Sequence, residues 1–215
     1  MEIAEIKNEK TQTVDTQAKI TPSLAVDILK EGNGRFVNDN PLNRNFREQI
    51  QETSTGQYPF ATVVSCIDSR IPTEIIFDQG IGDIFNARVA GNFVNKDILG
   101  SLEFACKLAG SKVIVVMGHT SCGAVKGACD HAKLGNLTQM LDKIMPAVDA
   151  ISTPEGTDRS SANLEFVNQV AAKNVEMTID NIKMQSQVLN EMHQNGEIDI
   201  VGAMYDVKSG KVTFS

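Results

Sequence analysis

Short runs of consecutive apolar residues recur along the chain and predict buried β-strands. The clearest runs are 61–65 and 112–117, which are rich in β-branched residues and show no alternation between apolar and polar positions. A continuous run of this length is typical of a parallel strand that is covered on both faces. Weaker patterns predict further strands at 83–87 and 198–204 and a short edge strand at 211–214.

Between these strands, apolar residues return at three- and four-residue steps, which predicts helices. One helix begins after Thr21, with Pro22 at its first position, and we expect Gly32 or Gly34 to interrupt it. The longest predicted helix runs from 174 to 192. Shorter helices are expected at 46–50, 71–77, 98–108 and 123–128. Alternating strands and helices indicate an α/β fold with a mostly parallel sheet of four to five strands, flanked by helices.

The first nineteen residues are polar and lack this periodicity, so we expect residues 1–19 to form a flexible N-terminal tail. The remaining residues, 20–215, are enough for a single domain with its own core. The chain does not start with a basic region followed by an apolar run, and no apolar stretch approaches the length of a membrane span. We therefore expect a cytoplasmic protein.

Charge and cysteine usage narrow the possible functions. The net charge of −7, without a cluster of Lys or Arg, argues against a nucleic-acid surface, and it favours a neutral substrate over an anionic one. The four cysteines do not have the density of a disulfide scaffold. We expect Cys106 and Cys129 to be free thiols, which leaves the other two for chemistry.

Those two cysteines and a histidine follow the two clearest strands. Cys66 comes directly after 61–65, and His119 and Cys122 come after 112–117. Open α/β sheets bind their ligands at the carboxyl edge of the strands, so we expect the three side chains to converge there. Two thiolates and an imidazole suit Zn²⁺ and leave a fourth tetrahedral position for water or substrate. We therefore predict one catalytic zinc ion per chain.

A closed structural zinc site is the alternative, but such sites usually pair short C-x₂-C units in small domains.

Two motifs, C-x-D-x-R at 66–70 and H-x-x-C-G at 119–123, resemble those of the bacterial β-class carbonic anhydrases. Other segments that look like this family are 31–36, 56–59, 88–92 and 202–206. The resemblance implies a lyase, a carbonate dehydratase, which converts CO₂ and water into bicarbonate and a proton by attack of zinc-bound hydroxide on CO₂. It also implies a homodimer or a higher even oligomer.

The resemblance assigns roles to three further residues. Asp68 either accepts a hydrogen bond from the zinc-bound hydroxide or binds zinc itself as a fourth ligand. Arg70 is expected to hold Asp68 through a bidentate pair. Gln57 matches a glutamine that orients the substrate from the partner subunit.

Two other functions are compatible with the same motifs. One is the hydrolysis of carbon disulfide or carbonyl sulfide on this fold. The other is a non-catalytic protein that senses bicarbonate and keeps the site without turnover. A CO₂ hydration assay with and without a chelator separates the leading function from the non-catalytic one.

Overall fold

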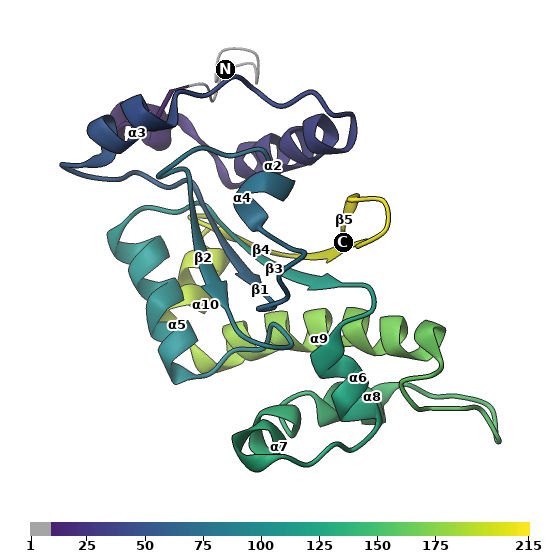
Figure 1. Ribbon diagram of the computed structural model, residues 1–215. Coiled ribbons are helices and arrows are strands. Elements are labelled where there is room, and N and C mark those ends of the chain that lie inside the picture. Colours follow the sequence, from purple (N-terminus) through teal and green to yellow (C-terminus); the bar gives the residue numbers. More distant parts are fainter. Residues whose placement is uncertain (1–9) are drawn as a thin grey trace.

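The computed structural model describes residues 10–215, which contain a five-stranded sheet (Figure 1). The strands are β1 (Ala61–Ser65), β2 (Ile84–Arg88), β3 (Val113–His119), β4 (Asp199–Tyr205) and β5 (Val212–Phe214). They lie in the order β2-β1-β3-β4-β5. The first four are parallel, and β5 pairs antiparallel with β4 at one edge. The predicted α/β fold with a mostly parallel sheet is therefore confirmed.

The register of the sheet brings the carboxyl ends of β1 and β3 together. Ser65, the last residue of β1, pairs with Met117 of β3. The next residue of the chain, Cys66, therefore leaves the sheet beside the end of β3. All residues of β1 and β3 are buried, as expected for central parallel strands that are covered on both faces.

Helices cover both faces of this sheet (Figure 1). Those in the described part of the chain are α1 (Val14–Lys19), α2 (Pro22–Val37), α3 (Phe46–Thr53), α4 (Thr73–Ile76), α5 (Lys96–Glu103), α6 (Gly123–Cys129), α7 (Gly135–Leu141), α8 (Met145–Ala150), α9 (Leu164–Gln185) and α10 (Gln187–Gln194), and a π-helical turn (Phe104–Leu108) follows α5. On one face, Val64 and Val116 cluster with apolar residues of α5, α9 and α10. On the other, Val63 and Met117 cluster with residues of α2 and α4. Within residues 10–215, no helix is both long enough and apolar enough to cross a membrane.

Helix α2 begins as predicted but does not stop at a glycine. Thr21 Oγ1 accepts the Leu24 N–H over 3.2 Å, which caps the first turn. The helix then continues through Gly32 and Gly34 to its end, so the predicted interruption is wrong. A Cβ atom at Gly32 would lie 1.8 Å from the carbonyl oxygen of Phe77. Gly32 therefore serves close packing on the segment after α4, and it does not end the helix.

The predicted helix 174–192 is in fact two helices. The first of these, α9, begins earlier, at Leu164, because Asn163 accepts the Phe166 N–H and caps it. Ser186 ends α9 and caps α10, since its Oγ accepts the Leu189 N–H and donates to Glu103 Oε1 over 2.6 Å. A contact with α5 thus stabilises the break in the helix.

The expected flexible tail covered residues 1–19. Residues 1–9 lie outside the described part of the chain. Residues 14–19 form the helix α1, which the sequence pattern did not predict. Gln17 Nε2 donates to the carbonyl oxygens of Pro59 and Ala109, each over 2.8 Å. This buried amide ties α1 to the segments that lead into β1 and β3.

Candidate metal centre

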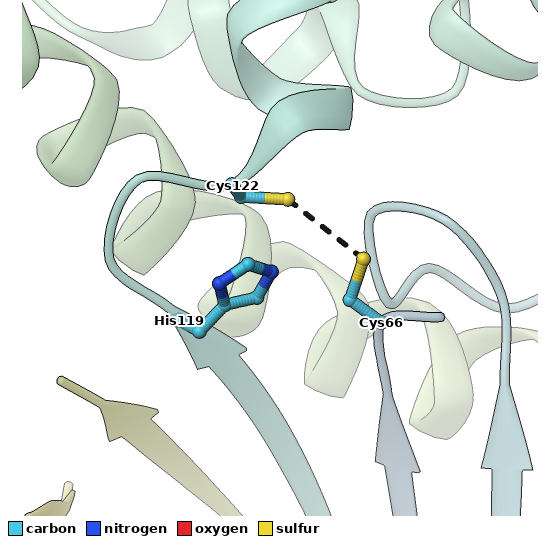
Figure 2. A group of neighbouring side chains, drawn as sticks. All are labelled: Cys66, His119 and Cys122. Atoms are coloured by element: carbon cyan, nitrogen blue, oxygen red, sulfur yellow. Dashed lines mark hydrogen bonds between the residues drawn. The ribbon is translucent and has the colours of Figure 1, made fainter. Parts of the chain in front are cut away.

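The three side chains that were predicted to bind metal converge at the carboxyl edge of the sheet (Figure 2). Cys66 follows β1, His119 is the last residue of β3, and Cys122 is the N-cap of α6. All three are buried, and their ligand atoms lie within 4.8 Å of one another. The two sulfur atoms are 3.9 Å apart. Two sulfur ligands of a tetrahedral zinc ion, each about 2.3 Å from the metal, would be about 3.8 Å apart.

The His119 ring presents one nitrogen to this centre. Its Nδ1 lies 3.0 Å from the Thr120 carbonyl oxygen and donates to it, which leaves a lone pair on Nε2. Nε2 is buried and has no hydrogen-bond partner within residues 10–215. An orphaned buried acceptor costs free energy unless another group satisfies it, and a metal ion does so. Two thiols and this free nitrogen therefore fit Zn²⁺.

The two thiols are hydrogen-bonded to each other. Cys122 Sγ donates to Cys66 Sγ, and this hydrogen bond lowers the pKa of Cys66, although burial acts in the opposite direction. The same hydrogen bond, together with burial, raises the pKa of Cys122. A cation that binds both sulfurs as thiolates displaces the proton of this hydrogen bond.

Two asparagines of α9 bond to loops at the centre, one between His119 and Cys122 and the other after β2. Asn168 Oδ1 accepts the backbone N–H of Ser121 over 2.9 Å, between the histidine and the second cysteine. Asn174 Nδ2 donates to the Gly91 carbonyl oxygen over 2.8 Å, and the Gly91 N–H donates to Cys66 Sγ over 3.3 Å. Sequence analysis did not identify either asparagine. For Asn174 a signal exists, because a polar residue occupies a position where the three- and four-residue steps predict an apolar one.

Asp68 and Arg70 lie beside the centre as an ion pair. Arg70 Nε donates to Oδ1 over 2.9 Å and Nη2 donates to Oδ2 over 2.7 Å, so the expected bidentate pair is present. These hydrogen bonds hold the pKa of Asp68 well below its usual range, and the carboxyl group is therefore ionised. Asp68 Oδ2 is 3.9 Å from His119 Nε2. Asp68 is not one of the three residues whose ligand atoms cluster, and its predicted role as a ligand stays a prediction.

Arg88, at the end of β2, supports the loop between Cys66 and Asp68. Its Nε donates to the carbonyl oxygen of Cys66 over 2.9 Å, and its Nη2 donates to that of Asp68 over 2.6 Å. One planar guanidinium group thus fixes the backbone at both residues. The backbone positions of Cys66 and Asp68 are therefore fixed relative to each other.

Gln57 lies away from the centre of its own chain. It is exposed and precedes β1, whereas Cys66 follows β1. At about 3.3 Å per residue, β1 separates the two positions by roughly 17 Å. The structure therefore brings Cys66, His119, Cys122 and Asp68 together within one chain but leaves Gln57 at the opposite edge of the sheet.

Comparisons with known proteins agree with one another. Residues 61–212 match the family described as carbonic anhydrase. A carbonic anhydrase of Mycolicibacterium smegmatis is 34% identical over 197 residues, which cover 89% of this chain and 92% of the relative. The crystal structure of a β-carbonic anhydrase of Aspergillus fumigatus has a TM-score of 0.67 and 26% identity, and the match covers 90% of this chain and 89% of that one. A structure of tetrameric β-carbonic anhydrases of Sordaria macrospora shares the fold, with a TM-score of 0.68, 23% identity, and coverage of 89% of this chain and 95% of that one.

Proposed function

Because the chain belongs to the β-class carbonic anhydrases, we propose that it catalyses the reversible hydration of CO₂ to bicarbonate and a proton at a zinc ion held by Cys66, His119 and Cys122. The observation that carries the zinc assignment is the buried group of two thiols and a ring nitrogen that has no hydrogen-bond partner in the described residues. A zinc ion held by these residues would supply Lewis-acid chemistry and a source of hydroxide near neutral pH.

Asp68 acts as a hydrogen-bond acceptor for the reacting water. Its carboxylate stays ionised because Arg70 donates to both oxygens, and one oxygen lies 3.9 Å from His119 Nε2. An ionised acceptor at this place orients a water lone pair toward CO₂. To become a metal ligand, Asp68 would first have to break its bidentate pair with Arg70. The observed pairing therefore favours the acceptor role over the ligand role.

The assembly we propose is a homodimer or a higher even oligomer, in which Gln57 of the partner subunit orients the substrate. The position of Gln57 supports this, because β1 separates it from the centre of its own chain. Large apolar side chains are exposed on α3 and α4, at Phe46 (55% exposed), Ile50 (57%) and Ile75 (60%), and a second subunit would cover such residues. The Sordaria macrospora relatives are described as tetrameric.

A stopped-flow assay of CO₂ hydration tests the proposed activity. The protein is assayed as purified, after removal of metal with a chelator, and after zinc is added back. We expect activity to be lost with the chelator and restored by zinc. If the zinc-loaded protein hydrates CO₂ no faster than the buffer does, the proposed function is wrong.

Sulfide release from carbon disulfide or carbonyl sulfide, measured on the same samples, tests the hydrolase alternative. Bicarbonate binding without turnover would indicate the non-catalytic alternative.

The cytoplasmic location and the extent of the zinc domain, residues 20–215, stay predictions.

A further inference from the structure

A buried asparagine in the middle of α9 contacts the loop beside the metal centre. Asn174 is 3% exposed, and its neighbours on the helix, Val170, Ala171 and Val175, belong to the apolar core. A buried amide costs free energy unless it forms hydrogen bonds. The bond from Asn174 Nδ2 to the Gly91 carbonyl oxygen, over 2.8 Å, satisfies this requirement. The amide group thus links α9 to one peptide of the loop after β2.

The backbone at Gly91 has little freedom to move. Its φ of +83° is one that residues with a Cβ atom rarely adopt. A Cβ atom there would also lie 2.4 Å from Ile144 Cδ1, so a side chain of the segment before α8 packs directly on this glycine. On the other side of Gly91, the Asn92 N–H donates to the Val89 carbonyl oxygen over 2.9 Å and closes the turn. The glycine is held by packing and hydrogen bonds, and Asn174 is the side chain that holds its carbonyl group.

The N–H of the same glycine, on the preceding peptide, donates to Cys66 Sγ, a proposed metal ligand, over 3.3 Å, so the restrained Gly91 backbone connects the Asn174 amide to this sulfur. An N–H that donates to a thiolate fixes the direction of the sulfur and draws electron density from it, which changes how strongly the sulfur donates to a metal. We propose that Asn174 is a positioning residue of the metal centre, which acts through Gly91 on Cys66. The inference rests on the proposed binding of zinc by Cys66.

The test compares Asn174→Leu, which keeps the size of the side chain and removes its donor, with Thr178→Val. Thr178 is also buried and lies one turn further along α9, so the control makes a similar polar-to-apolar change. Zinc affinity is measured by competition with a chelator, and the protein is also loaded with Co²⁺, whose thiolate-to-metal absorption band reports on the sulfur. We expect Asn174→Leu to weaken zinc binding by about 10- to 100-fold. The band should move to longer wavelength, because a thiolate without its N–H donor gives up an electron more easily. Thr178→Val should leave both unchanged.

A purely structural role for Asn174 predicts a different result. Such a role would lower the temperature of unfolding without moving the cobalt band of the folded protein. Asn174→Ala removes the donor without adding apolar bulk, and the same band shift is expected for it if the leucine variant does not fold. Unchanged band positions and zinc affinities in these variants would overturn the inference and leave the proposed function intact. A wild-type protein that binds neither zinc nor cobalt would instead refute the proposed function.

Discussion

Cys66 and Cys122 differ from the other two cysteines in their surroundings, although all four are buried. Burial raises the pKa of Cys106 to about 12, and it also raises the pKa of Cys129. Both thiols are therefore protonated and unreactive. At Cys66 the hydrogen bond from Cys122 lowers the pKa. A second thiol, a ring nitrogen and a directed N–H thus distinguish the surroundings of Cys66 from those of Cys106 and Cys129.

Removing one ligand should abolish metal binding and activity together. Cys66→Ser, His119→Ala and Cys122→Ser each leave two ligands, which are too few to fix a tetrahedral ion. We expect zinc content and CO₂ hydration to fall to background in each of these variants. Cys106→Ser changes a buried thiol outside the centre and should retain both. Metal analysis that finds full zinc occupancy in all three ligand variants would contradict the assignment.

Asp83 is a buried carboxyl group away from the metal centre, directly before β2. Burial is the main cause that raises its pKa, and the charge of Asp78 acts in the same direction. The Gly80 N–H and the charge of Arg44 act in the opposite direction, and together these effects raise the pKa of Asp83 to about 6. In the unfolded chain the pKa of an Asp is about 3.9. Between these two values the folded state keeps a proton that the unfolded state loses. The contribution of Asp83 to stability is therefore complete below about pH 4 and is lost as the pH rises through about 6.

The loss of stability with rising pH predicts how the Asp83→Asn variant should differ from wild type. The variant cannot ionise, so its free energy of unfolding should increase relative to wild type by about 1 to 2 kcal/mol between pH 5 and pH 7.5. Urea unfolding at several pH values measures this difference, with Asp142→Asn, which changes an exposed carboxyl group, as the control. A difference between Asp83→Asn and wild type that is independent of pH would show that burial does not shift this group.

At the level of whole elements, α2 contains two glycines with opposite surroundings. A Cβ atom at Gly32 would lie 1.8 Å from the Phe77 carbonyl oxygen, whereas one at Gly34 would have no atom within 4 Å. Gly32→Ala should therefore destabilise the protein by about 1 to 3 kcal/mol, since backbone must move. Gly34→Ala should stabilise it by up to about 1 kcal/mol, because alanine favours the helix. Urea unfolding of the two variants is the measurement, and equal effects would mean that α2 does not pack closely on the segment after α4.

Helix α9 contacts two loops at the centre without supplying a ligand candidate. It packs on the sheet through Val175 and Ile182, and the same helix contacts both loops that surround the ligands, through Asn168 and Asn174. A site is held most accurately when rigid elements support its loops. The metal centre is therefore coupled to the core by a helix that supplies no ligand.

At the scale of the whole molecule, the position of Gln57 predicts complementation between subunits. Neither Gln57→Ala nor His119→Ala should be active alone. In a mixed dimer, the intact metal centre of the Gln57→Ala chain would receive Gln57 of the partner subunit. Co-expression of equal amounts should restore about a quarter of the sites, because half of the dimers are mixed and each has one complete site. Activity that stays at background, in mixed dimers confirmed by mass spectrometry, would contradict the proposed assembly.

Much of the site could be predicted from the sequence because its determinants are local. The strands before Cys66 and His119 are visible as short apolar runs, and parallel strands end at one edge of a sheet, so the convergence of the three ligands follows. The N-cap at Thr21 is equally local, since Thr and Pro act on the adjacent turn. Residue types and short-range spacing thus determined the sheet, the start of α2 and the set of metal-ligand candidates.

Only the tertiary structure decided which distant groups complete these elements. Asn174 and Gly91 are 83 residues apart, as are Ser186 and Glu103, and no local pattern connects either pair. The same holds for Gln17, whose side chain bonds to carbonyl groups 42 and 92 residues away and orders a segment that looks like a tail. A hydrogen bond between a side chain and a remote partner depends on how the elements pack. The sequence by itself therefore determined the strands and the chemistry of the ligands, and packing decided what holds those ligands in place.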